Sequence, residues 1–257
     1  MRWGAVIVAA GRGLRLGRPK QFIEIAGVPM VGWSIQTFAA MPQIAELVIA
    51  TEPESIEPMS ALVRRLAPNL PHRVVRGGEL RQDSAREGVM ALSDRCEAAF
   101  VHDGARPLVT PVDVLAGMRE VREGRASLLA EPVVDTIKLV DRDSLIVGAT
   151  LDRGTLWAAQ TPQFALAGDL RAAHERGRLE GIAVTDDAAL LERIGISVVV
   201  VASTSENFKV TLPGDVTRAE TILNSRLVIL SPSTPLGINS VEGRQDDRTV
   251  ILSAVEE

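Results

Sequence analysis

The stretch AVIVAAGRGLRLGRPKQF, residues 5–22, decides the fold. It opens with the apolar, β-branched run Val6-Ile7-Val8, which is the pattern of a strand buried on both faces of a parallel sheet. Small residues follow immediately, so the backbone beyond the strand can approach a ligand closely. The stretch therefore predicts a central strand followed by a ligand-binding loop.

This loop carries the groups that a polyphosphate needs. We expect Gly11 and Gly13 to take the positive φ values of a tight anion-binding loop. Beyond them Arg15 and Lys20 supply two cations, and Pro19 stiffens the approach to Lys20. The same residues would also suit an ordinary strand-to-helix turn with solvated charges, because short glycine motifs are common.

Two familiar phosphate-binding loops do not fit. The Walker spacing of Gly, four residues and Gly-Lys-Ser/Thr is absent, and Leu16 stands where a dinucleotide fingerprint requires Gly. The remaining pattern, a strand followed by AAGxGxR and PKQ, resembles the signature loop of nucleotidyltransferases. Such enzymes transfer a nucleoside monophosphate from a triphosphate to a phosphorylated acceptor.

Composition agrees with an enzyme of this kind. The chain has 257 residues, of which 46% are hydrophobic, so one α/β domain can bury a large core. The net charge of −5 argues against nucleic acid as a partner, because a phosphate backbone needs a basic face. Cys96 is the single cysteine, which excludes an intrachain disulfide. Without a signal peptide or a membrane-length apolar run, we expect a cytoplasmic protein with no membrane partner.

Strand-like and helix-like segments alternate along the chain. We expect strands at 47–50, 74–75 and 100–101, and helices at 31–40, 56–66 and from an Asp83-Ser84 N-cap through 92. This alternation predicts an α/β fold: a mostly parallel sheet with helices on both faces. Ligands of such sheets bind at the carboxyl ends of the strands.

Two further motifs follow predicted strands. In RGGELRQDSAREG, residues 76–88, Gly78 allows close approach and Ser84 offers a donor to a base or phosphate, although a capped helix after a glycine turn has the same pattern. In HDGARP, residues 102–107, Asp103 is placed to bind Mg²⁺ or to cap the next turn. Arg106 is a candidate cation for the acceptor phosphate. His102 is interpreted as structural, because magnesium prefers oxygen ligands.

The pattern changes at residues 132–150, which read as two strands around a polar turn. An isolated β-ribbon is marginally stable, so we expect this protruding β-arm to pack on a second copy of the chain. Beyond the arm we expect a helix to about Arg178, a helix within 184–195 capped by Thr185, Asp186 and Asp187, a buried strand at 198–201, and a last helix that opens near Pro213.

Taken together, eight motifs in order resemble the 2-C-methyl-D-erythritol 4-phosphate cytidylyltransferase family: AAGRGLRLGRPKQF, GGELRQDSAREG, HDGARP, DTIK, DRGTLW, QTPQF, TDDA and NFKVT. The resemblance implies a Rossmann-like homodimer joined by the β-arm. It also implies transfer of CMP from CTP to 2-C-methyl-D-erythritol 4-phosphate, with Mg²⁺, in isoprenoid precursor biosynthesis. We expect a catalytic domain at 1–225 and an extension of unassigned role at 226–257.

The resemblance also implies roles for individual residues. The catalytic cations would be Arg15, Lys20 and Lys209. The nucleotide would contact Ala9, Ala10, Gly11, Gly13, Gly78, Glu79 and Ser84, with Glu79 standing where an Asp is common. The acceptor would contact Asp103, Arg106, Thr136, Arg153, Thr161 and Thr185, with Thr136 and Arg153 supplied by the partner subunit. Asp103 would also hold the metal.

The amino-acid sequence alone leaves three other functions open. A cytidylyltransferase for another alditol phosphate, such as ribitol 5-phosphate, would share the glycine loop and the HD-x-x-RP motif. A sugar-1-phosphate nucleotidyltransferase fits less well, because its acceptor motifs differ. A catalytically silent nucleotide-binding or scaffold protein would have lost Arg15, Lys20 or Asp103, and all three are present.

Overall fold

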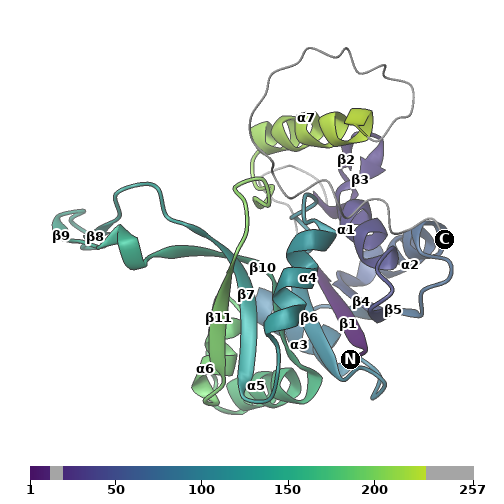
Figure 1. Cartoon of the computed structure of the whole chain (residues 1–257), viewed down its shortest axis with the longest axis horizontal. Helices are drawn as coiled ribbons and strands as arrows, with labels where there is room; N and C mark the ends of the chain where they lie inside the picture. The colour runs from purple at the N-terminus through teal and green to yellow at the C-terminus, as the bar shows by residue number, and fades with distance from the viewer. Residues whose placement is uncertain (12–19, 230–257) are drawn as a thin grey trace, which may run out of the picture.

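The computed structural model of the chain describes residues 1–11 and 20–229 (Figure 1). Gly13, Arg15 and almost all of the 226–257 extension lie outside the described residues. Within the described ranges, none of the helices has both the length and the apolar character needed to cross a bilayer.

One seven-stranded sheet forms the centre of the fold. Its strands are β1 (Trp3–Ala9), β4 (Ile44–Thr51), β5 (His72–Arg76), β6 (Ala98–Asp103), β7 (Arg125–Pro132), β10 (Trp157–Leu166) and β11 (Ser197–Ala202). They lie in the order β11-β7-β10-β6-β1-β4-β5. Neighbouring strands are parallel except where β10 pairs with β6 and β7. The prediction of a mostly parallel, Rossmann-like sheet is confirmed.

Helices cover both faces of this sheet, also as predicted. One face carries α1 (Met30–Ala39), α2 (Ile56–Leu66) and α4 (Pro111–Glu120), and the other carries α3 (Arg81–Met90), α5 (Ala167–Leu179) and α6 (Ala188–Arg193). The last helix, α7 (Pro213–Ile229), packs beside the short pair β2 (Glu24–Ile25) and β3 (Val28–Pro29). It begins at Pro213, as expected, because proline needs no N–H partner in the first helical turn.

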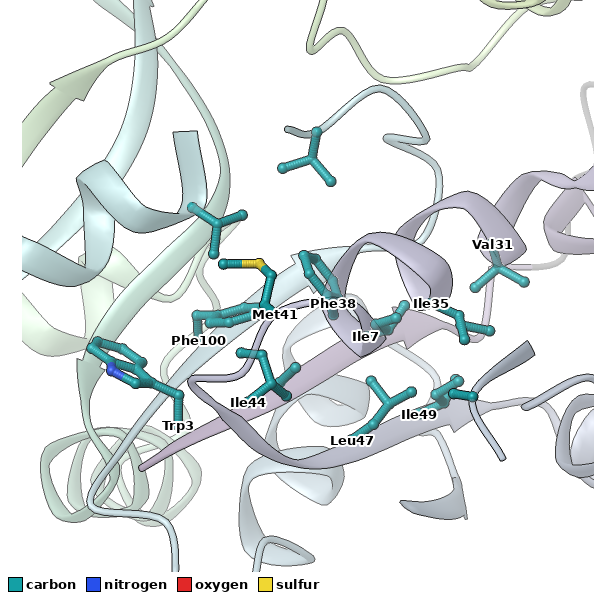
Figure 2. Close-up of a cluster of buried hydrophobic side chains, with 14 of the residues drawn as sticks. Trp3, Ile7, Val31, Ile35, Phe38, Met41, Ile44, Leu47, Ile49 and Phe100 are labelled. Atoms are coloured by element: carbon teal, nitrogen blue, oxygen red, sulfur yellow. The ribbon is translucent and has the colours of Figure 1, made fainter. Parts of the chain in front are cut away.

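The central strand β1 supplies side chains to both cores, because successive residues of a strand point to opposite faces. Ile7 packs with Ile35 and Phe38 of α1 in the cluster of Figure 2. Val6 points the other way and joins Val89 of α3. Ile7 and Val6 are fully buried, so the strand is fixed on both sides and the loop after it leaves from a rigid base.

Two sequence expectations need correction. The helix assigned an Asp83-Ser84 N-cap begins earlier, at Arg81, because the Asp83 carboxylate accepts the N–H of Leu80 at 3.2 Å and closes the first turn. The segment 198–201 forms part of β11, which is the edge strand of the sheet. Its side chains are half-buried or exposed rather than buried, since a neighbouring strand lies on one side only.

The predicted β-arm leaves the body of the molecule (Figure 1). It contains β8 (Lys138–Val140) and β9 (Val147–Thr150), which pair in antiparallel fashion. Asp141 Oδ1 closes their turn by accepting from the backbone N–H and the hydroxyl of Ser144, at 2.9 and 2.7 Å. Leu145 and Ile146 at the tip are 71% and 69% exposed, so the arm carries unburied apolar surface.

Candidate active site

The candidate site lies where the direction of the chain across the sheet reverses. From β1 the chain proceeds to β4 and β5 on one side, and then returns to β6 on the other side of β1. Parallel sheets bind ligands at the carboxyl ends of the strands beside such a switch point. Here the two ends carry Ala9 and Asp103, and the backbone N–H of Gly104 donates to the carbonyl of Val8 at 2.9 Å.

A pocket opens at this point, between the glycine loop, the short helix η2 (Lys20–Phe22) and the end of β6. The residues that line it and bear on its chemistry are Ala9, Gly11, Lys20, Arg81, Asp103 and Lys209. Five of these six were predicted from sequence and one was missed. The structure therefore brings together residues from four separate motifs of the chain.

Asp103 is the central acid of the pocket. Its carboxylate is held by Arg81, with Nε 2.8 Å from Oδ1, and by Lys209, with Nζ 2.6 Å from Oδ2. Burial alone would raise the pKa of Asp103, but the two cations outweigh burial and hold that pKa below its usual range. Asp103 is therefore an anion at neutral pH, ready to bind cationic groups.

Arg81, the residue that sequence reasoning missed, also reaches Asp187 at 2.9 Å. Burial alone would lower the pKa of Arg81, yet Asp187 and Asp103 together raise it, so the guanidinium stays charged. A local signal did exist: a cation in the first turn of α3 opposes the helix dipole, which indicates acidic partners elsewhere.

Asp187 departs from its expected role. It was predicted with Thr185 and Asp186 to cap the following helix. Asp186 does so, accepting the N–H of Ala189 at 3.2 Å, whereas the side chain of Asp187 makes no cap bond. Asp187 instead turns inward to Arg81, because that buried cation offers a stronger partner than a helix end. Thr185 is exposed beside it.

Thr161 lies behind Asp103 and is 4% exposed. Its hydroxyl accepts the N–H of Asp103 at 3.0 Å and lies 3.2 Å from His102 Nδ1. Because His102 Nε2 faces the carbonyl of Arg106, which only accepts, that nitrogen carries the proton and Nδ1 accepts from Thr161. The structure thus engages the hydroxyl of Thr161 inside the protein instead of presenting it to an acceptor.

His102 is fully buried, which agrees with its interpretation as structural. Burial lowers its pKa to about 3, so the ring is neutral at physiological pH. The imidazole ring also packs against the ring of Phe38 in a T-shaped arrangement, with the ring centroids 5.2 Å apart. His102 and Thr161 together fix the backbone on both sides of Asp103.

Arg106 is half-buried and points to main-chain carbonyls. One terminal nitrogen donates to the carbonyl of Asn207 at 2.6 Å and the other to that of Ala159 at 3.5 Å. Arg106 thereby holds the segment that carries Lys209 close to the end of β6. In this arrangement its guanidinium serves the protein itself, and contact with an acceptor phosphate would require it to change partners.

A second hollow adjoins the first at Gly11 and is lined by Ala10, Arg76, Gly77, Gly78 and Glu79. Ser84 lies beneath this wall, 1% exposed, and its hydroxyl accepts the N–H of Gly78 at 3.1 Å. A Cβ at Gly77 would lie 2.5 Å from that of Ala10, and a Cβ at Gly78 would lie 2.2 Å from that of Asp83. Both glycines are therefore required by close packing within the loop.

Gly11 does not behave as expected. Its φ lies outside the positive range, and among the described residues an added Cβ would meet only Lys20 Cε, at an ordinary 3.5 Å. The prediction of a left-handed Gly11 is therefore wrong. A glycine at this position also leaves room for the close approach of a ligand.

Thr136 and Arg153 lie on and beside the β-arm and are exposed. Arg153 donates to the carbonyl of Val134 at 2.8 Å, inside the arm. Neither residue lines the two hollows described above, and Figure 1 shows the arm directed away from the body. Within a single chain, the fold does not bring these two residues to the pocket.

The described residues contain no group of three or more His, Cys, Asp or Glu side chains able to hold a metal ion. Asp103 is the predicted protein ligand for the metal. That suits Mg²⁺, which keeps several waters and combines one or two carboxylates with substrate phosphates. Both oxygens of Asp103 face cations here, so a metal at this carboxylate would require Lys209 or Arg81 to shift.

Gly11, two lysines and a charged aspartate line the pocket at the switch point of the sheet. The family that the chain matches is one of nucleotidyltransferases, and the chain is therefore a nucleotidyltransferase. The family model described as 2-C-methyl-D-erythritol 4-phosphate cytidylyltransferase matches residues 4–225. The chain belongs to this family.

Relatives support the assignment along nearly their whole length. The enzyme of that name from Pelotomaculum thermopropionicum is 39% identical over 225 residues, covering 86% of this chain and 94% of the relative. That from Thermosynechococcus vestitus is 40% identical over 224 residues, covering 86% and 95%.

Solved structures agree. The 4-diphosphocytidyl-2C-methyl-D-erythritol synthase of Anaerococcus prevotii superimposes with a TM-score of 0.77 at 28% identity, covering 87% of this chain and 98% of that one. The 2-C-methyl-D-erythritol 4-phosphate cytidylyltransferase of Thermus thermophilus gives a TM-score of 0.70 at 29% identity, covering 87% and 100%.

Proposed function

We propose that the chain catalyses the reaction of its family, the transfer of CMP from CTP to 2-C-methyl-D-erythritol 4-phosphate. The products are 4-diphosphocytidyl-2-C-methyl-D-erythritol, an isoprenoid precursor, and pyrophosphate. The observation that carries the proposal is the meeting of Lys20, Lys209 and Asp103 beside the backbone of Gly11. These groups combine cations for a triphosphate with a carboxylate for a divalent metal.

The reaction needs positioning more than proton transfer. An oxygen of the acceptor phosphate, already an anion at neutral pH, forms a bond to the α-phosphorus of CTP while the bond to pyrophosphate breaks. No side-chain base is required, and the main difficulty is to bring anions together on a crowded phosphorus. We assign Lys20 and Lys209, with Arg15 of the glycine loop, to the phosphates of the reacting centre.

The nucleotide would occupy the hollow beside Ala10, Gly78 and Glu79, continuous at Gly11 with the phosphate pocket. We also assign Ala9 at the end of β1, Gly13 of the glycine-loop motif and Ser84 of α3 to the nucleotide, with Ser84 acting through the N–H of Gly78. Asp103 would hold Mg²⁺, and the bound metal would neutralise negative charge on the phosphates. Arg106, Thr161 and Thr185 surround the acceptor side, with Thr161 acting through Asp103.

We further propose a homodimer formed by the β-arm. Exposed apolar side chains on the arm, among them Val134 at 82% and Leu139 at 58%, would be covered by a second copy. The partner subunit would then supply Thr136 and Arg153 to the acceptor site.

The cytoplasmic location and the domain boundary at 225 stay predictions. Arg226 of α7 donates to the carbonyl of Leu108 at 3.0 Å, so the extension begins within a packed helix.

An acceptor panel tests the function. Purified protein with CTP and Mg²⁺ would be given 2-C-methyl-D-erythritol 4-phosphate, ribitol 5-phosphate or a sugar 1-phosphate, and pyrophosphate release would be measured. We expect release with the methylerythritol phosphate alone. Faster release with ribitol 5-phosphate would replace the proposed acceptor, and no release with any acceptor would contradict the function.

A further inference from the structure

A series of buried polar side chains leads from the pocket into the body of the protein. Its first member is Asp103, the carboxylate that the proposed reaction uses. Arg81 donates to Asp103 and to Asp187, at 2.8 and 2.9 Å. Behind Asp187, His174 Nε2 lies 3.1 Å from Asp187 Oδ1, without the alignment of a hydrogen bond. Asp187 and His174 are each 1% exposed.

Neither catalysis nor stability explains Asp187. It does not line the pocket, so it has no direct contact with a substrate there. Buried ion pairs seldom add stability, because the cost of desolvating two charges offsets their attraction. The planar guanidinium of Arg81, however, becomes rigid once two of its edges are bound. Asp187 therefore gives Arg81 one orientation.

We propose that Asp187 is a positioning residue, which holds Arg81 against Asp103 and so fixes the direction of the Asp103 carboxylate toward the triphosphate. The inference rests on the proposed function. Without Asp187, Arg81 would be free to turn toward an incoming polyphosphate, because guanidinium pairs strongly with phosphate. The pocket would then lose the orientation of its acid and gain a misdirected cation.

This arrangement divides the two cations of Asp103 into different roles. Arg81 is bound by two carboxylates and its side chain is 22% exposed. Lys209 approaches the other oxygen from the pocket and is 37% exposed. Arg81 is thus the fixed partner and Lys209 the exchangeable one, so that Oδ2 becomes accessible to a divalent cation when Lys209 turns to a phosphate.

The test replaces Asp187 by asparagine, which keeps the shape of the side chain and removes its charge. Binding of CTP would be measured by calorimetry with and without Mg²⁺, in the absence of acceptor so that nothing turns over. We expect metal-free CTP affinity not to fall, because a released Arg81 can pair with the phosphates, and the gain in affinity on adding Mg²⁺ to fall about tenfold. Turnover with acceptor should fall about tenfold to 100-fold with KM for the acceptor little changed.

Two further variants separate positioning from loss of stability. Asp187→Glu retains the charge and should recover part of the Mg²⁺-dependent gain. Glu46→Gln is a matched control, because Glu46 is a buried carboxylate paired with Arg73 at 3.3 Å near the opposite end of β4. It should leave the gain unchanged even if the protein unfolds at a lower temperature.

The inference would be overturned by a folded Asp187→Asn protein in which Mg²⁺ increases CTP affinity as much as in wild type. An equal loss of this increase in Glu46→Gln would overturn it as well. If Asp187→Asn does not fold, Arg81→Lys makes the same test, since lysine keeps the charge and lacks the fork that binds two carboxylates. Its expected result is the same loss, and a wild-type gain would again refute the inference. A wild-type protein that neither binds CTP nor releases pyrophosphate would instead refute the proposed function.

Discussion

Lys209 Nζ lies 2.6 Å from Asp103 Oδ2, although 106 positions separate the two residues in the chain. Main-chain contacts on either side of Lys209 produce this pairing. The N–H of Val210 donates to the carbonyl of Ala105 at 2.8 Å, and the carbonyl of Asn207 accepts from Arg106. The backbone of the late lysine is thus held beside the motif that carries the aspartate.

The first prediction follows from this pair. Lys209→Met removes the charge and keeps the length of the side chain, so kcat should fall about 100-fold or more, the typical effect of losing one preorganised donor. Affinity for CTP should change much less, because other cations still face the phosphates. Single-turnover kinetics and calorimetry would measure the two quantities. Arg64→Met, at an exposed ion pair with Glu57 on α2, serves as the control, and a kcat within about threefold of wild type in Lys209→Met would contradict the role.

Lys20 gives a second prediction. It lines the pocket at the start of η2, immediately after the glycine loop. Lys20→Ala should lower turnover far more than CTP binding, since its charge is needed most when the phosphorus is crowded. Arg15→Ala should behave in the same way. Near-normal turnover in both folded variants, judged by circular dichroism and steady-state rates, would be incompatible with the assigned roles.

A third prediction concerns the β-arm. If Arg153 completes the acceptor site of the partner subunit, the variants Arg153→Ala and Lys20→Ala damage different sites of a mixed dimer. Mixing the two inactive proteins should restore activity, because a mixed dimer contains one site with both residues intact. Subunit exchange would be monitored with differently tagged chains. Proven exchange without any recovery would show that the sites are not shared between chains.

The fourth prediction concerns acid stability. The folded state holds His102 neutral with a pKa of about 3, whereas the ring in the unfolded chain titrates near 6.5. Below pH about 6.5 the unfolded state takes up a proton that the folded state does not, so stability falls as pH falls. At pH 5 this loss amounts to about 2 kcal/mol.

Urea unfolding of wild type and His102→Gln at pH 7.5 and pH 5.0, both without metal, measures this contribution. The variant should be less stable than wild type at pH 7.5, because it lacks the hydrogen bonds to Thr161 and Arg106. Its further loss on acidification should be smaller than that of wild type by about 2 kcal/mol. Equal losses in the two proteins would indicate that burial does not hold the ring neutral.

Local sequence pattern predicted much of this fold for a physical reason. The central strand depends on residues that are neighbours in the chain, as does α2, whose expected range 56–66 is the observed one. The edge position of β11 depends on which strands pair, and that information is not local. An apolar run such as 198–201 has the same pattern at an edge as at the centre of a sheet.

The site was predictable to the extent that its residues follow strands. Asp103 and Lys20 were found because strand ends and glycine loops have local signatures. Arg81 and Asp187 were not assigned to the site, since their pairing spans 106 positions and each resembles an ordinary residue at a helix start. The cation in the first turn of α3 was the available signal.

The last prediction concerns nucleotide choice. The wall of the nucleotide hollow beside Gly77 and Gly78 is main chain, tied to neighbouring elements: Gly77 N–H donates to the carbonyl of Thr51 at 2.7 Å and Gly78 N–H to Ser84. Such a wall has fixed donors and acceptors and little room to move, so it can distinguish the 4-amino group of cytosine from the carbonyl of uracil. One mispaired buried group costs about 1–3 kcal/mol. UTP should therefore be used about tenfold to 100-fold less well than CTP, and purine triphosphates less well still on steric grounds.

The measurement is kcat/KM for the four triphosphates with methylerythritol phosphate and Mg²⁺, in wild type and in Gly77→Ala. The new methyl group would lie 2.8 Å from Ser84 Oγ and closer still to Ala10, so the loop must shift, and the preference for CTP over UTP should shrink. Gly168→Ala on α5 is the matched control, because no atom of the described residues outside its own helix backbone and chain neighbours lies within 4 Å of its added Cβ. Equal use of CTP and ATP by wild type would show that this wall does not select the base. An unchanged preference in a folded Gly77→Ala protein would place the selection elsewhere.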